Sequence, residues 1–147
     1  MSSTYFYTIG YEGRSINGLL EVLLSNKIAT VVDIRELPHS RIVGFSKNQL
    51  SNMLEHSGIK YVSARQLGSP RELRNEYRRT GNWDDFAQEF ASFLQTRREE
   101  IDQLTSRVYA EKICLLCFER DSEVCHRSLV ADAVKKHSGN GLRVKNL

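Results

Sequence analysis

The run from Ile113 to Glu119, Ile-Cys-Leu-Leu-Cys-Phe-Glu, constrains the fold more than any other segment. Its apolar residues follow one another without polar alternation, which is the pattern of a buried strand. The strand ends in Glu119, and Cys125, His126 and Arg127 come after a short polar stretch. Because ligands of open α/β sheets bind outside the carboxyl ends of the strands, we expect these four side chains to gather at a site there.

Strands and helices alternate along the chain. Residues 30–34, Thr-Val-Val-Asp-Ile, form a β-branched run typical of a strand covered on both faces. Further strands are expected at residues 5–10, 59–62 and 142–144, and helices at residues 15–24, 46–58, 83–104 and 124–137. The highly charged residues 70–81 fit either a short helix or a flexible excursion. The alternation predicts a three-layer α/β sandwich with a mostly parallel sheet, as a single domain over residues 1–147.

Two of the expected helices begin with a capping signal. Ser15 precedes the apolar stripe of the first helix. Ser46 and Gln49 have the spacing of a capping box at the start of the second.

The composition fits a globular protein, with 40% hydrophobic and 27% charged residues in 147. No apolar run approaches the roughly 18 residues of a membrane span. The start, Met-Ser-Ser-Thr-Tyr, lacks the basic and apolar regions of a signal peptide. We therefore expect a cytoplasmic protein without membrane contact. Its three cysteines, an odd number, favour reduced thiols over a disulfide framework.

The net charge is slightly basic, with 21 Lys and Arg against 18 Asp and Glu, well short of a dedicated nucleic-acid binder. The basic residues are unevenly distributed. One short segment concentrates several arginines: Arg65, Arg71, Arg74, Arg78 and Arg79. They fit either a local anionic ligand or a solvated helix face balanced by Glu72 and Glu76.

Basic and hydroxyl side chains also follow the strand at residues 30–34. They are Arg35, Ser40, Arg41 and Lys47. Their donors suit a phosphate or a carboxylate, and structural ion pairing explains one or two of them but not all four. We expect charge reversal at Arg35 to abolish binding of such a ligand and to leave the fold intact, because a loop cation contributes little to the core.

Three further polar residues belong to strands or their ends. Tyr11 and Glu12 follow the first strand, where they either cover the ligand or form a plain turn. Asp33 lies within an apolar run, so it needs a partner, and we expect a backbone amide or Arg41 in that role.

The candidates for chemistry are Glu119, Cys125 and His126. Cys125 is expected near a helix N-terminus, where free N–H groups and the neighbouring His126 and Arg127 favour a thiolate, so it is either a nucleophile or a structural cysteine. Glu119 is either a general acid or base or the partner of an arginine. We favour Glu119, because adjacent residues at a helix start point about 100° apart and Cys125 and His126 are then poorly placed for proton transfer. Arg127 joins the candidate binding residues.

The other cysteines give no metal assignment. Cys114 and Cys117 lie three residues apart on a strand, so they point to opposite faces and do not chelate one ion. A zinc site from Cys117, Cys125 and His126 stays open as a weaker alternative. We assign no metal, and the sequence leaves any cofactor open.

Several motifs together carry a family resemblance. They are Thr8-Ile-Gly-Tyr-Glu-Gly13, Val32-Asp-Ile-Arg-Glu-Leu-Pro-His-Ser40, Gly44-Phe-Ser-Lys47, Gln66-Leu-Gly68, and Leu115-Leu-Cys-Phe-Glu119 with Cys125-His-Arg127. In this order they resemble the family catalogued as domain of unknown function 488 (DUF488). The resemblance implies a small Rossmann-like α/β fold with a catalytic or nucleotide-related role. One departure is Asn146, which stands in the last strand where the family pattern leads us to expect a histidine.

These features favour an enzyme, a hydrolase or a transferase, that acts on a nucleotide, nucleoside or nucleic-acid component at the carboxyl edge of the sheet. Two alternatives remain: a non-catalytic module that binds a nucleotide or nucleic acid, and a redox sensor that uses Cys125. The expected partner is an anionic small molecule or a nucleic-acid component. The sequence leaves the oligomeric state open.

Overall fold

The computed structural model describes residues 4–139 and 141–147. Its strands are β1 (Thr4–Gly10), β2 (Thr30–Asp33), β3 (Lys60–Ser63), β4 (Ile113–Cys117) and β5 (Leu142–Asn146). Its helices are α1 (Ile16–Ser25), α2 (Lys47–His56), α3 (Arg71–Thr80), α4 (Trp83–Gln95), α5 (Arg98–Ala110) and α6 (His126–Ser138), with short 3-10 turns η1 (Arg65–Leu67) and η2 (Ser122–Val124).

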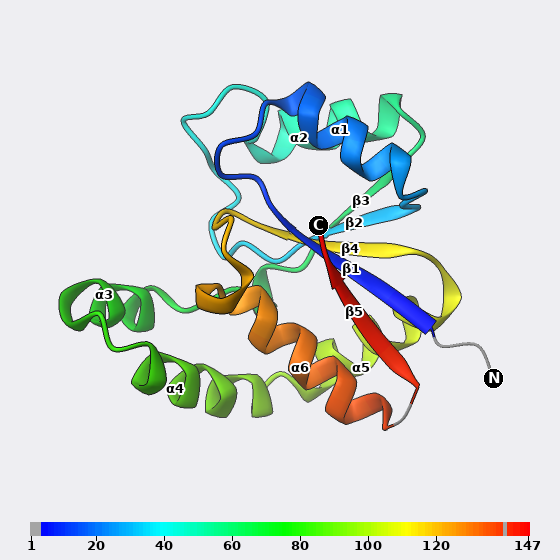
Figure 1. The fold of residues 1–147 in the computed structure, drawn as a ribbon. Coiled ribbons are helices and arrows are strands. Elements are labelled where there is room, and N and C mark those ends of the chain that lie inside the picture. Colours follow the sequence, from blue (N-terminus) through cyan, green and yellow to red (C-terminus); the bar gives the residue numbers. More distant parts are fainter. Residues whose placement is uncertain (1–3, 140) are drawn as a thin grey trace.

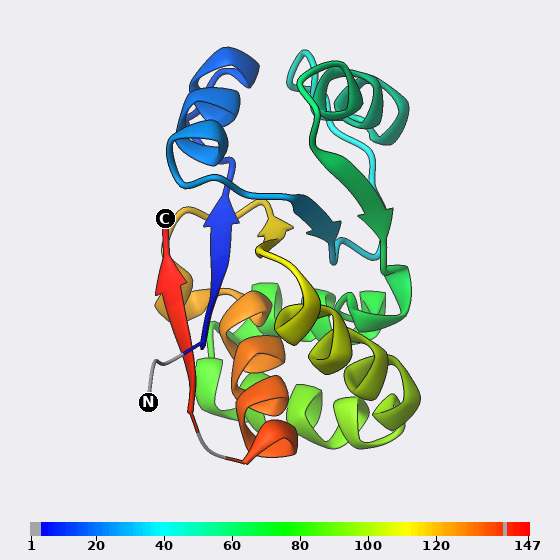
Figure 2. The ribbon, with the colours of Figure 1, turned by 90° about the vertical axis from the view of Figure 1, so that its right-hand side faces the viewer.

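The sheet lies between two layers of helices (Figure 1). Within the described residues it has the strand order β3-β2-β4-β1-β5, and all neighbouring strands are parallel. Helices α1 and α2 cover one face, and α4, α5 and α6 cover the other, as the side view also shows (Figure 2). This is the three-layer α/β sandwich predicted from the sequence, with a fully parallel sheet.

Strand β4 lies at the centre of the sheet, and each of its residues is buried. It pairs with β2 on one side and β1 on the other, so Asp33 lies beside Leu116 and Gly10 beside Cys117. The three strands therefore end at one edge of the sheet. The loops that follow them share this edge, as the order of the strands requires.

Two apolar cores fill the spaces on either side of the sheet. Cys117 belongs to the core under α4, α5 and α6, which is rich in aromatic residues from α4. Cys114 belongs to the core under α1 and α2. The prediction that these two cysteines point to opposite faces is confirmed, because side chains alternate along a strand.

The segment expected as one long helix over residues 83–104 is two helices. Helix α4 ends at its C-cap Thr96, whose hydroxyl donates a 2.6 Å hydrogen bond to the carbonyl of Phe93, and α5 begins at Arg98. Both helices keep the apolar periodicity that predicted a single one, so the sequence pattern hides the break. The charged segment before them forms helix α3, which ends at Gly81 in the left-handed conformation with φ of 67°.

Only one of the two capping signals forms as expected. The hydroxyl of Ser15 accepts a 3.0 Å hydrogen bond from the amide of Gly18. The hydroxyl of Ser46 instead donates to the carbonyl of Ser40, and the side chain of Gln49 accepts from the amide of Gly44. The capping box is therefore absent, because the preceding loop folds back and takes both side chains.

Among the described residues, no helix has the length and apolar character needed to cross a membrane.

Gly10, at the end of β1, should tolerate no side chain. A methyl group there would run into the backbone carbonyl of Glu119 and come within 2.7 Å of the Arg127 guanidinium. We expect Gly10→Ala to lower the free energy of unfolding by about 3 kcal/mol, because neither group can retreat without moving the loop after β4. Chemical denaturation followed by circular dichroism measures the change.

Gly18→Ala is the matched control. Its added methyl would meet only the Ser15 hydroxyl, at 3.2 Å, and alanine favours the helical backbone there. A loss in Gly10→Ala no larger than in this control would contradict the close approach of β1 to the loop.

Candidate functional site

A cleft of about 560 Å³ opens at the carboxyl edge of the sheet. Its wall combines the loops after β1, β2 and β4 with residues of α3 and the start of α6. The lining residues are Tyr11, Arg35, Glu36, Leu37, His39, Ser40, Arg41, Ser69, Arg74, Arg78, Phe118, Glu119 and His126. A second hollow of the same volume lies between α4, α5 and α6, away from the strand ends.

Arg35 forms the buried floor of the cleft on the β2 side. Its side chain is 6% exposed and binds Asp33 through two nitrogens, Nε to Oδ1 at 2.9 Å and Nη2 to Oδ2 at 2.7 Å. The remaining nitrogen donates to the Tyr11 hydroxyl and to the carbonyl of Phe45. Burial alone would lower the pKa of Arg35, but hydrogen bonding and attraction to Asp33 raise it above its ordinary value.

Two expectations about this pair need correction. Asp33 does accept a backbone amide, that of Arg35, but its side-chain partners are Arg35 and Tyr61 and not Arg41. Arg35 is not a free loop cation, because the carboxylate that it neutralises is fully buried. Charge reversal at Arg35 would therefore place two negative charges together in the core, and we now expect it to destabilise the fold.

The other arginines of the cleft come from two other elements. Arg41 lies in the loop after β2, and Arg74 and Arg78 lie one turn apart on α3. Arg74 is engaged with Glu36 at 3.0 Å and with the carbonyl of Ser69. Arg41 and Arg78 have no ion-pair partner within the described part of the chain.

The remaining predicted binding residues differ in position. Tyr11 lines the cleft and is stacked on Phe45, with ring centroids 4.4 Å apart. Glu12 lies outside the lining and accepts a hydrogen bond from the amide of Arg120. The Ser40 hydroxyl accepts from the amide of Ile42, which closes a turn at the rim. Lys47 is exposed at the start of α2 and is not part of the lining.

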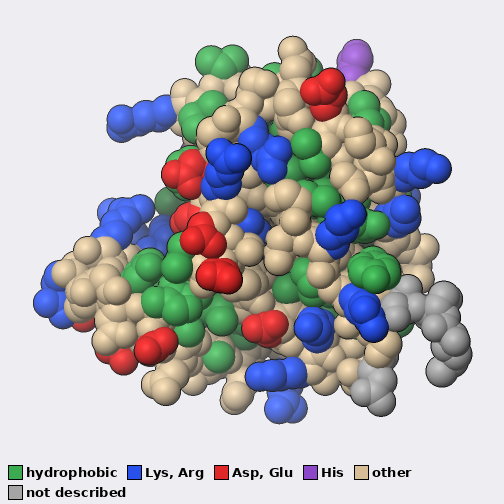
Figure 3. All heavy atoms as spheres, in the orientation of Figure 1, with side chains coloured by type: hydrophobic (Ala, Val, Ile, Leu, Met, Phe, Trp, Pro, Cys, Tyr) green, Lys and Arg blue, Asp and Glu red, His purple; other side chains and the backbone are tan. Residues whose placement is uncertain are grey.

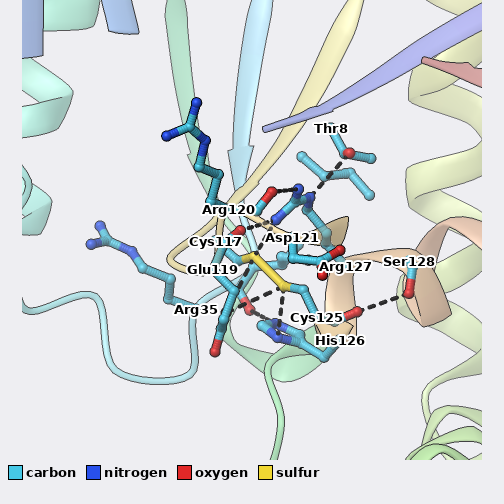
Figure 4. The surroundings of a disulfide bond; sticks show 12 residues. Thr8, Arg35, Cys117, Glu119, Arg120, Asp121, Cys125, His126, Arg127 and Ser128 are labelled. Carbon is cyan, nitrogen blue, oxygen red and sulfur yellow. Dashed lines mark hydrogen bonds between the residues drawn. A yellow bond between two sulfur atoms is a disulfide. The ribbon is translucent and has the colours of Figure 1, made fainter. Parts of the chain in front are cut away.

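The three predicted catalytic residues meet at the floor of the cleft on the β4 side (Figure 4). Oε2 of Glu119 lies 3.3 Å from Sγ of Cys125, and Sγ of Cys125 lies 3.9 Å from Nδ1 of His126. Cys117, which ends β4, lies beside them with its Sγ 3.7 Å from the same Glu119 oxygen. The chain thus gathers two sulfurs, a carboxylate and an imidazole at one point.

Cys125 and His126 lie closer together than expected. The expected angle of about 100° between the two side-chain directions applies only when both residues are helical. Cys125 is instead the N-cap of α6 and has an extended backbone. His126 Nε2 lies 3.1 Å from the carbonyl of Ile34. Burial lowers the pKa of His126, so the imidazole is neutral and does not supply the positive charge expected beside Cys125.

Arg127 lies beneath the cleft and is fully buried. Its Nε donates to the Thr8 hydroxyl, and its two terminal nitrogens donate to the carbonyls of Glu119 and Arg120. One of them also lies 3.4 Å from Sγ of Cys117. Desolvation lowers the pKa of Arg127. In this position it supports the loop after β4 and is not exposed to a ligand in the cleft.

The sulfurs of Cys117 and Cys125 lie in bonding contact, drawn as a disulfide in Figure 4. This contact departs from the three reduced thiols expected from the sequence. The Cα atoms, however, are 7.9 Å apart, whereas those of disulfides are usually about 4.4–6.8 Å apart. A relaxed disulfide would therefore require the backbone to move. Cys114 is a free thiol, and burial raises its pKa.

The family model for domain of unknown function DUF488 matches residues 15–134. The chain belongs to the DUF488 family. No curated protein and no solved structure gives a significant match. The matched range of this DUF488 domain includes the loop after β2, helix α3 and the cluster around Cys125, but it excludes β1 and β5.

The departure at Asn146 lies outside that matched range. Its Oδ1 accepts a 2.5 Å hydrogen bond from the hydroxyl of Thr8, and the same hydroxyl accepts from Arg127. In this DUF488 domain Asn146 is thus linked through Thr8 to the buried guanidinium of Arg127, which contacts Cys117 of the cluster.

Sequence reasoning missed part of the site. Cys117 entered only the weaker zinc alternative with Cys125 and His126, although its sulfur belongs to the cluster at the strand end. Arg74 and Arg78 were noticed only as members of a charged segment, and His39 and Ser69 carried no signal. The spacing of Arg74 and Arg78 by four residues could have shown that they share a helix face.

Asp33→Asn should destabilise this DUF488 domain strongly. The substitution removes the charge that compensates the buried Arg35, which typically costs about 3–5 kcal/mol of unfolding free energy. Urea unfolding followed by circular dichroism measures the loss.

Glu76→Gln is the control for Asp33→Asn, because it breaks the ion pair to Arg79 on the exposed face of α3. We expect no measurable change in that variant. Equal stability of the two variants would show that the Asp33–Arg35 pair does not support the fold.

Proposed function

We propose that this DUF488 domain is an enzyme that acts on a nucleotide or another phosphate-bearing nucleic-acid component in the cleft at the sheet edge. One observation carries the proposal. Two cations without ion-pair partners among the described residues, Arg41 and Arg78, line the same cleft as the reactive groups Glu119 and His126. A phosphate held by the cations would bring the rest of the ligand over these groups.

The dimensions of the cleft favour a ligand of nucleotide size. Its volume of about 560 Å³ falls within the range of small-molecule sites, about 300–1,000 Å³. On the face shown in Figure 3, basic and acidic side chains are interspersed, so that face lacks the continuous basic track that a long nucleic acid requires. Tyr11 and Phe118 add aromatic surface beside the cations, with ring centroids 5.3 Å apart.

Glu119 is the proposed general acid or base. Its carboxylate is exposed to the cleft, whereas Cys125 is buried behind it. A group that exchanges protons with a ligand must reach it directly or through one water, and of the three proposed catalytic residues only Glu119 is exposed. Cys125 and His126 are proposed to complete the floor on which Glu119 acts.

Arg35 is proposed to act by shaping the cleft, because its nitrogens are already bonded to Asp33, Tyr11 and Phe45. It holds the Tyr11 ring in place, and the direct contacts to an anion then fall to Arg41 and Arg78. A non-catalytic binding module would use the same cations and would differ only in lacking turnover.

Removing the two unpaired cations should weaken nucleotide binding. The double variant Arg41→Ala/Arg78→Ala is expected to raise the Kd of the tightest of AMP, GMP, CMP and UMP by at least about tenfold, because each charged hydrogen bond contributes about 1.5–3 kcal/mol. Isothermal titration calorimetry measures the Kd.

Arg79→Ala is the matched control for this double variant. Arg79 lies next to Arg78 on the same helix, but it pairs with Glu76 and does not line the cleft. An equal loss of affinity in the control, or none of the four nucleotides binding to the intact protein, would count against an anion site in the cleft.

Glu119→Gln should separate catalysis from binding. If Glu119 transfers a proton, kcat on a nucleotide substrate is expected to fall by about 10²–10⁴-fold with a KM close to that of the intact protein. Glu12→Gln, on the loop after β1, is the control and should keep kcat. Full activity in Glu119→Gln would remove the proposed role, and binding without turnover in the intact protein would favour the non-catalytic module.

A further inference from the structure

We infer that Cys117, Cys125 and His126 hold a zinc ion, with the carboxylate of Glu119 at the fourth coordination position, facing the cleft. One ligand atom from each of the four residues lies within 4.8 Å of the others. Across residues 4–139 and 141–147 this is the only group of three or more His, Cys, Asp or Glu side chains with such a geometry. The inference goes beyond the proposed function and does not depend on it.

Three of the distances inside the cluster are close to those around a tetrahedral zinc ion. With Zn–S bonds of about 2.3 Å and Zn–N or Zn–O bonds of about 2.0–2.1 Å, neighbouring ligand atoms lie about 3.5–3.8 Å apart. The observed separations are 3.3 Å from Cys125 to Glu119, 3.7 Å from Cys117 to Glu119, and 3.9 Å from Cys125 to His126. Shifts of a few tenths of an ångström would suffice for these three contacts, whereas the sulfurs of Cys117 and Cys125, which lie in bonding contact, would have to turn apart to admit the ion.

The imidazole of His126 is held as a metal ligand usually is. The carbonyl of Ile34 can only accept, so Nε2, 3.1 Å away, carries the ring proton. The lone pair of Nδ1 is then directed at the sulfur cluster. The ring also packs edge-on against Phe90, with centroids 5.6 Å apart. A backbone carbonyl that fixes the second nitrogen is the common support of zinc-bound histidines.

The charge of the surroundings also fits. Zinc with two thiolates, one carboxylate and a neutral imidazole carries one net negative charge. The guanidinium of Arg127 lies 3.4 Å from Sγ of Cys117, is fully buried, and has no carboxylate at ion-pair distance within the described residues. The zinc cluster would give this buried cation the anionic partner that it lacks.

The backbone geometry favours a metal ion shared by the two cysteines over a direct bond between their sulfurs. Cys117 ends β4 and Cys125 caps α6, and their Cα atoms are 7.9 Å apart, beyond the usual range of about 4.4–6.8 Å for a disulfide. Two thiolates joined through a metal ion span a greater distance, because a metal atom lies between the sulfurs. Zinc binding would release the thiol protons to solvent without oxidation.

The donor set selects the metal. Two thiolates and an imidazole favour zinc over hard cations such as Mg²⁺, which prefer oxygen ligands. Three of the four ligands are buried or half-buried, whereas Glu119 is exposed. We therefore expect the first three to determine affinity and Glu119 to be the exchangeable ligand, as at zinc sites that keep one position open to substrate.

Metal binding to the full chain tests the inference. Protein purified with a thiol reductant is dialysed against zinc, and bound metal is measured by mass spectrometry of the metal. We expect about one zinc ion per chain. Cobalt substitution should give the charge-transfer absorption of thiolate ligands and the intense visible bands of tetrahedral Co²⁺. Mg²⁺ in excess should not displace the ion.

The cysteine variants supply the matched comparison. Cys125→Ala should lose the bound zinc, and Cys114→Ala, which removes a buried thiol from the same strand as Cys117 but on the opposite face, should keep it. Glu119→Gln should retain zinc with weaker affinity. The cobalt spectrum of the intact protein keeps the test valid even if a variant fails to fold.

Three results would overturn the inference. They are a folded and reduced protein that binds no zinc, equal zinc loss in Cys114→Ala and Cys125→Ala, and a Cys117–Cys125 disulfide that persists under mild reductant. Each readout is taken without nucleotide. Failure of the nucleotide experiments would therefore leave the zinc site standing, and failure here would leave the nucleotide proposal standing.

Discussion

The buried guanidinium of Arg127 is the interaction on which the site depends. It extends from the first turn of α6 toward the ends of β1 and β4, where it bonds with Thr8 and with the carbonyls of Glu119 and Arg120. A planar group with several donors can hold three chain segments at once, which a lysine could not do in the same geometry. Gly10 leaves the space for this contact. The positions of Glu119, Cys125 and His126 follow from it.

A second buried guanidinium organises the opposite wall. Arg35 joins Asp33 to Tyr11 and to the loop at Phe45, and Tyr61 on β3 donates a 2.6 Å hydrogen bond to Asp33. Burial and this hydrogen bond raise the pKa of Tyr61, so the phenol remains a donor. The ends of β1, β2 and β3 are therefore tied together. Both walls rest on arginines inside the protein, whereas Arg41 and Arg78 line the cleft with exposed side chains.

Much of the fold could be predicted because apolar periodicity is a local property of the sequence. The unbroken run at β4 predicted a buried strand, and the alternation of strands and helices predicted the layers. The break between α4 and α5 could not be predicted in this way, since both helices bury the same stripe. The failed capping box at Ser46 depended on a loop contact with Ser40, which no local pattern encodes.

The candidate site was predictable in location but not in its internal contacts. The parallel topology brings Tyr11, Arg35 and Glu119 to one cleft, as strand order required. The burial of Arg35 and Arg127 was missed, because arginine is usually a surface residue and a sequence does not show which cation will have its donors satisfied inside. The same limitation left Cys117 in a weaker zinc alternative, because its apolar neighbours are those of an ordinary core residue.

The position of Arg127 also bears on the two sulfurs beside it. Cys125 precedes Arg127 by two residues at the start of α6, so any backbone shift that brings Cys125 closer to Cys117 also moves the base of the Arg127 side chain. That shift would disturb bonds to two backbone carbonyls and to Thr8, which are costly to leave unmade in a buried setting. The network therefore resists the approach of the two Cα atoms that a relaxed disulfide needs. An ion between the sulfurs would make no such demand on the backbone, because the two side chains can turn their sulfurs apart while the Cα atoms keep their separation of 7.9 Å.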